Sequence, residues 1–73
     1  MWLERQFNNH GRVHRFVVTN DGEGWAVREE EDSAVLRQTV RQDWHRVEID
    51  IRLFELRALA LTGDGWIEND RPD

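Results

Sequence analysis

Residues 43–61 constrain the fold more than any other stretch, because they carry two apolar stripes at helical spacing. In an α-helix each residue advances about 100° around the axis, so residues three or four positions apart share a face. One stripe contains Trp44, Val47, Ile51, Phe54, Ala58 and Leu61. The other contains Ile49, Leu53, Leu56 and Ala60. A single sheet can cover only one such face, so the second stripe needs another cover.

The ends of this segment carry the signals of a helix. Asp43 lies where an N-cap acceptor belongs, while Gly63 and Gly65 follow the last apolar residue and favour termination. A strand is the competing interpretation, because alternate residues from 47 to 53 are apolar. That alternation is short, whereas the helical spacing continues to Leu61. We therefore predict one helix over residues 43–61.

Three segments before the helix have the composition of strands. Residues 12–19 alternate between two faces, residues 20–24 are rich in turn formers, and an acidic turn at 29–33 precedes a third apolar segment. The sequence predicts an α+β domain in which a three-stranded antiparallel meander over residues 12–19, 24–30 and 34–41 packs against the helix.

The alternative for residues 33–42 is an earlier start of the helix, since Leu36 and Val40 continue the Trp44 stripe backwards. That arrangement would leave only a two-stranded hairpin, which is marginally stable alone. With the strand, the predicted core lies between the sheet and the first helix stripe. It contains Phe16, Val18, Trp25, Val27, Leu36, Val40, Trp44, Val47, Ile51, Phe54 and Leu61.

The remaining segments flank a single domain over residues 12–67. Residues 1–11 form an N-terminal arm that is frayed, or a short strand, or a cover for an apolar surface. We expect Trp2 or Phe7 to dock, with the second helix face as one location. Trp66 should fold back on the helix end. Residues 68–73 are predicted to be a disordered tail.

Composition excludes several classes of protein. The chain of 73 residues has no cysteine, so disulfides and thiolate metal sites are absent, and oligomerisation is a remaining way to stabilise a small core. No apolar run is long enough to span a bilayer, and we expect a cytoplasmic protein without membrane contact. The net charge of −5 opposes binding to nucleic acid phosphates.

No set of residues predicts catalysis, a metal site or a cofactor. The three histidines, including His14 and His45, do not have the spacing of helical zinc motifs. Ser33 is the only serine and suits a turn, and the glycines of residues 22–24 lack the context of a phosphate loop. We therefore predict no catalytic, cofactor-binding or metal-binding residue, and a protein that is not an enzyme.

Three short stretches carry a resemblance. Trp25-Ala26-Val27-Arg28, Asp43-Trp44-His45-Arg46-Val47-Glu48 and Gly65-Trp66 resemble a pattern in small uncharacterised bacterial proteins, over about residues 13 to 67. The resemblance implies a short antiparallel sheet, a helix opened by the second stretch and a Gly-Trp close. It implies no activity, and this chain departs from the pattern after Glu48, where Ile49 and Ile51 make the helix more apolar.

These observations predict a protein-interaction module that forms a homodimer through the second helix stripe. The proposed interface contains Ile49, Leu53, Leu56 and Ala60. An unidentified protein is the other candidate partner. One alternative is a monomer of unknown regulatory role whose arm covers the helix, and another is a single-stranded nucleic-acid-binding domain that uses Trp and Arg side chains.

Overall fold

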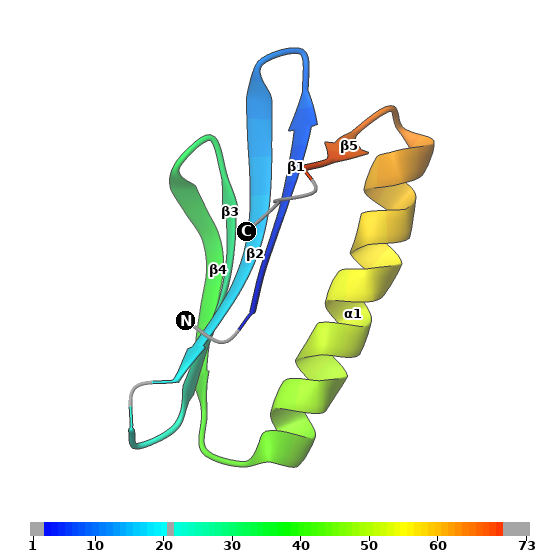
Figure 1. Cartoon of the computed structure of the whole chain (residues 1–73). Helices are drawn as coiled ribbons and strands as arrows, with labels where there is room; N and C mark the ends of the chain where they lie inside the picture. The colour runs from blue at the N-terminus through cyan, green and yellow to red at the C-terminus, as the bar shows by residue number, and fades with distance from the viewer. Residues whose placement is uncertain (1–2, 21, 70–73) are drawn as a thin grey trace.

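Figure 1 shows one helix lying along one face of an antiparallel sheet. The computed structural model describes residues 3–20 and 22–69. The strands are β1 (Leu3–Asn9), β2 (Arg12–Asn20), β3 (Trp25–Glu31), β4 (Ala34–Arg41) and the two-residue β5 (Ile67–Glu68), and the helix is α1 (Trp44–Gly63). The sheet order is β4-β3-β2-β1-β5. The α+β class is confirmed, and the prediction of only three strands is wrong.

The additional strand β1 comes from the segment that was predicted to be an arm. It pairs with β2 along its whole length, from Leu3 opposite Val18 to Asn9 opposite Arg12. Between them, His10 and Gly11 both have positive φ, at 50° and 83°. Positive φ at both central residues is the geometry of the two-residue turns that match strand twist. Trp2 lies outside the described residues.

The C-terminal segment also joins the sheet. Phe7 pairs with Glu68, and the backbone N–H of Asn69 donates to the carbonyl oxygen of Gln6 at 2.7 Å. Glu68 and Asn69 are therefore held by β1, whereas the rest of the predicted disordered tail, residues 70–73, lies outside the described residues.

Residues 34–41 form the strand β4 rather than a helical extension, but its faces are the reverse of those predicted. Arg37 pairs with Glu29 and Val35 with Glu30, so Leu36 is an extra residue in a β-bulge. A shift of one residue moves every later side chain to the other face. Leu36 and Val40, predicted in the core, are instead 57% and 61% exposed.

The core otherwise lies where the patterns place it, between the sheet and the first helix stripe. Phe16 and Phe54 stack with ring centroids 4.6 Å apart, and Phe7, which was not in the predicted core, packs edge-on against Phe16 at 6.0 Å. The buried cluster contains Phe7, Phe16, Val18, Val27, Val47, Phe54 and Ala58. The half-buried residues packed on it are Leu3, Trp25, Trp44, Ile51, Leu61 and Trp66.

The helix ends as its sequence signals predict. Asp43 Oδ1 accepts a hydrogen bond from the backbone N–H of His45 at 3.0 Å. At the other end Gly65 has φ of 96°, and the Trp66 N–H donates to the Leu61 carbonyl at 3.0 Å. These are the features of a Schellman C-cap, and they turn Trp66 back onto the core as expected.

Candidate functional site

Residues 3–20 and 22–69 leave the second helix stripe uncovered. Val47, Phe54 and Ala58 are buried on the side of α1 that faces the sheet, and the predicted interface residues lie on other sides of the helix. Ile49, Leu53 and Leu56 are 45%, 49% and 61% exposed, and Ala60 is also exposed. Residues 3–9 do not cover them, since Leu3 and Phe7 pack against the core. All four interface residues therefore share one open surface, the outer stripe of α1.

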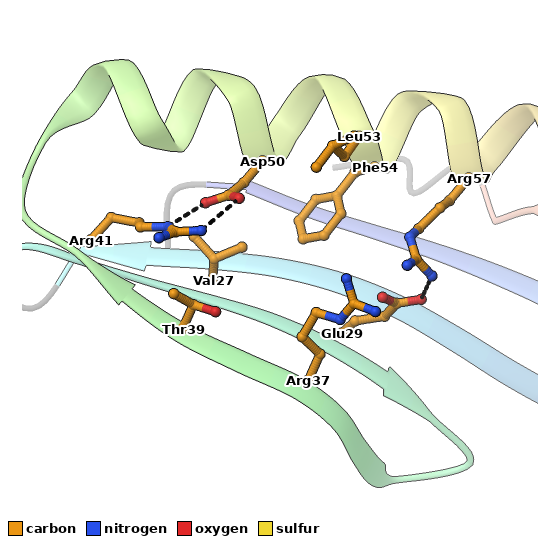
Figure 2. Close-up of a pocket in the computed structure, with 9 residues that line it drawn as sticks. All are labelled: Val27, Glu29, Arg37, Thr39, Arg41, Asp50, Leu53, Phe54 and Arg57. Atoms are coloured by element: carbon orange, nitrogen blue, oxygen red, sulfur yellow. Dashed lines mark hydrogen bonds and ion pairs between the residues drawn. The ribbon is translucent and has the colours of Figure 1, made fainter.

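A cavity of about 230 Å³ lies beside this stripe, between α1 and strands β3 and β4 (Figure 2). It was not predicted from the sequence, because its walls depend on the bulge that turns β4 over. The bulge brings Arg37, Thr39 and Arg41 to the side of the sheet that bears the helix. The lining residues are Val27, Glu29, Arg37, Thr39, Arg41, Asp50, Leu53, Phe54 and Arg57.

Two ion pairs cross this cavity from sheet to helix. Arg41 donates to both carboxylate oxygens of Asp50, at 2.9 and 3.2 Å, and this hydrogen bonding raises the pKa of Arg41. Arg57 Nη1 donates to Glu29 Oε2 at 3.2 Å. The bidentate contact between Arg41 and Asp50 fixes the relative orientation of the two side chains as well as pairing their charges. The two ion pairs tie α1 to β4 and β3 at two points along the helix.

Arg37 is the third guanidinium at the cavity and is differently placed. It is exposed, and Figure 2 shows its side chain rising from β4 toward the helix, beside Glu29. Within residues 3–20 and 22–69, Arg37 has no hydrogen bond or ion pair. The cavity wall thus combines three arginines with two carboxylates, and one positive charge is not balanced locally.

Behind the cavity, Glu29 belongs to a buried charged cluster. His14 Nε2 lies 2.8 Å from Glu29 Oε2 and His14 Nδ1 lies 3.0 Å from Glu31 Oε1. His14 and Glu29 are only 5% and 3% exposed. His14 also packs edge-on against Phe16 and Trp66, at 5.1 and 5.9 Å between ring centroids. This arrangement is a polar cluster at the edge of the core, bordered by aromatic rings.

The face of the sheet opposite the helix is covered differently. Arg15 bridges Glu4 at 2.5 Å and Glu30 at 3.4 Å, and Arg28 lies 2.6 Å from Glu30. Under these side chains Val17 is 2% exposed, because long arginine stems shield apolar neighbours. Over β1 to β3 this face therefore presents paired charges, whereas on β4 it carries the exposed Val35 and Val40.

In the part of the chain that the structure describes, no three His, Cys, Asp or Glu side chains are placed to hold a metal ion. His45 lies on the exposed helix surface, 3.9 Å from Glu48, far from the core position of His14. Over the same residues, no helix is long and apolar enough to cross a bilayer.

The predicted site and the cavity thus meet at Leu53, which belongs to both the outer stripe and the cavity wall. Four stripe residues were predicted from spacing alone, whereas the arginine cavity had no sequence signal apart from the scattered arginines. No protein-family model, no curated protein and no solved structure matches this chain.

Proposed function

We propose that this protein is an interaction module that forms a homodimer through the outer stripe of α1. The observation that carries the proposal is an apolar helix face that the chain's own described residues leave open. Exposed apolar patches of this kind mark association surfaces more often than isolated apolar residues do. The proposal includes no catalytic activity.

The spacing of the outer stripe suits pairing with a second copy. Its residues follow one another at intervals of four, three and four, a pattern that is the same in both directions. Two antiparallel helices related by a twofold axis near residues 54 and 55 would place Leu53 against the partner's Leu56. Ile49 would lie against the partner's Ala60. A twofold interface requires this self-complementarity.

The charges beside the stripe favour the same pairing. In the antiparallel arrangement, Arg52 of one helix lies on the same flank as Glu55 of the other, within about one helical turn of the axis. On the opposite flank, Arg46 lies near Asp64 of the other copy. Each contact occurs twice by symmetry. Four ion pairs would therefore border the apolar contact and fix the relative direction of the two helices.

The expected affinity is modest. Ile49, Leu53 and Leu56 are about half exposed in the monomer, so covering them contributes about 2–5 kcal/mol per protomer. A symmetric pair doubles this, against an association cost of about 4–15 kcal/mol. A dimer that dissociates on dilution is the expected result.

The test is the solution mass by light scattering during size-exclusion chromatography, over at least a tenfold dilution. We expect twice the chain mass of 8.8 kDa at high concentration, and the single-chain mass for Leu56→Glu. Arg52→Glu should weaken the dimer, and the exchange Arg52→Glu with Glu55→Arg should restore it.

Leu36→Glu is the matched control, because Leu36 is about as exposed as Leu56 but lies on β4. This variant should keep the wild-type mass. If Leu36→Glu gives monomers while Leu56→Glu does not, the interface lies at the β4 edge and the proposal is wrong. A wild-type monomer at every concentration would equally reject self-association.

The alternative functions have no comparable support. Trp25 and Trp44 pack against each other, with centroids 5.2 Å apart, and Trp66 contacts His14, so these rings contribute to the core. A stacking surface for single-stranded bases needs exposed rings. A cytoplasmic location stays part of the proposal, supported by the cysteine-free, acidic composition. The resemblance to small bacterial proteins also stays a prediction.

A further inference from the structure

The arginine cavity between α1 and β4 has the parts of a small anion-binding site. Its polar wall presents three guanidinium groups, of which Arg41 is held by Asp50 through two hydrogen bonds. Arg57 uses one nitrogen for Glu29 and is 44% exposed at its side chain. Arg37 contacts no charged group in the described ranges 3–20 and 22–69. Two guanidinium groups that line the same cavity therefore have N–H groups available for further hydrogen bonds.

The charge at this cavity contrasts with that of the whole chain. Three arginines face two carboxylates, which leaves one positive charge, in a protein whose net charge is −5. Arginine presents a planar array of donors that matches carboxylate and phosphate oxygens. An anionic group between Arg37 and Arg57 would complete the charge balance of the wall.

The rest of the cavity is apolar. Val27 and Phe54 form part of its lining next to Leu53 from the helix, and the hydroxyl group of Thr39 offers one more polar contact. A volume of about 230 Å³ is slightly below the usual range for drug-sized ligands. It equals the liquid volume of about eight water molecules. A ligand of this size has room for one charged group and a short hydrocarbon chain.

We propose that this cavity binds a small organic anion, with a carboxylate or phosphate group between Arg37 and Arg57 and an apolar part against Leu53 and Phe54. This inference does not depend on the proposed dimer. Its test uses the Leu56→Glu variant as well as the wild type, because Leu56 does not line the cavity.

The experiment is a titration of the ¹⁵N-labelled protein, followed by amide chemical shifts, with butyrate and separately with butyl phosphate. We expect saturable shifts at Thr39, Leu53 and Phe54 in both backgrounds. Butanol and butylammonium, which match the hydrocarbon chain, should cause no saturable shift. The two anions together show whether the site prefers a carboxylate or a phosphate.

Arg37→Gln should weaken binding about tenfold, the usual effect of losing a charge-assisted hydrogen bond. Arg28→Gln, on the face of the sheet opposite the helix and outside the cavity, should leave it unchanged. The amide spectrum itself reports whether each variant is folded. Equal binding by Arg37→Gln, shifts confined to other residues, or no saturable shift with either anion would overturn the proposal. A monomeric wild type that still binds would reject only the dimer.

Discussion

At the scale of single residues, His14 has the most demanding environment in the described structure. Both of its ring nitrogens face carboxylate oxygens, yet a neutral imidazole has only one N–H to donate. The two contacts place the His14 ring between the carboxyl groups of Glu29 and Glu31. Arg57 and Arg12 supply further positive charge to Glu29 and Glu31. Pairing of this kind makes burial of these groups tolerable.

The presence of His14 on the helix-facing side of its strand was predictable, because it alternates with Phe16 and Val18. The partners of His14 were not predictable from the sequence. Glu29 and Glu31 belong to an acidic run that is typical of an exposed turn, yet Glu31 pairs with His14 across the strands and Glu29 with Phe16. Only strand register places two of these carboxylates beside an imidazole, and register depends on contacts between distant segments.

Asp32 allows a prediction about pH. A hydrogen bond from the backbone N–H of Val13 at 2.9 Å, followed by contacts with Arg12, holds the pKa of Asp32 below its ordinary value. The folded state therefore binds this proton less readily than the unfolded state. The resulting stabilisation is full above the unfolded pKa of about 4 and is lost as pH falls through the lower folded value.

Asp32→Asn removes that stabilisation at neutral pH. We expect the difference in unfolding free energy between wild type and Asp32→Asn to shrink as pH falls from 6 toward 2, measured by urea unfolding. Glu48→Gln, at an exposed helix position, is the control and should change stability by less than about 0.5 kcal/mol. A difference between wild type and Asp32→Asn that stays constant with pH would contradict the assigned role of the carboxylate.

At the scale of elements, predictions succeeded where several local signals agree and failed where a β-bulge intervenes. Helix α1 was predicted within two residues at its end, because its caps and its apolar spacing agree. Strand β4 was predicted with the correct bounds and the wrong face, since one extra residue at Leu36 reverses its sides. No local pattern distinguishes a bulged strand from a regular one here. That reversal creates the arginine cavity, so the cavity was not predictable either.

The close approach of Gly24, just before β3, to Arg41 at the end of β4 supplies a test at this scale. A Cβ atom added to Gly24 would lie 2.6 Å from the backbone carbonyl oxygen of Arg41, which cannot move without opening the strands. We expect Gly24→Ala to lower the unfolding free energy by about 1–3 kcal/mol in urea unfolding. Because Arg41 carries the ion pair to Asp50, the change should also loosen the link between β4 and α1.

Gly63→Ala is the matched control. Gly63 lies in the last turn of α1, has no positive φ, and would place a new Cβ atom with nothing within 4 Å. Alanine is a better helix former than glycine, so this substitution should be neutral or stabilising by up to about 1 kcal/mol. A loss of stability at Gly63 equal to that at Gly24 would mean that close packing against Arg41 is not the cause.

At the scale of the whole molecule, β1 joins the C-terminal segment to the rest of the sheet. It lies between β2 and β5 in the strand order. The sequence offered weak signals for it, because Arg5 separates the two apolar residues Leu3 and Phe7, and its turn contains His10 instead of the usual Asn. Arg5 fits this position by pairing with Glu68 and by lying 5.5 Å from the Phe7 ring centroid.

Phe7→Ala tests whether the N-terminal segment is an integral part of the fold. Phe7 is fully buried and contacts Phe16, so its truncation should cost about 3–5 kcal/mol. That loss is comparable to the whole stability expected of so small a core, so Phe7→Ala should be largely unfolded at 25 °C by circular dichroism. Phe7→Leu keeps most of the apolar volume and should stay folded with a lower melting temperature.

Leu59→Ala gives the comparison, since Leu59 is 71% exposed on α1 and its truncation should change stability by less than about 0.5 kcal/mol. If Phe7→Ala were as stable as Leu59→Ala, residues 3–9 would be a dispensable arm and the four long strands would reduce to three. If instead Phe7→Ala unfolds, the N-terminal segment belongs to the core. It could not then be released to cover the outer stripe of α1 without unfolding the sheet, which leaves that stripe free for a second copy.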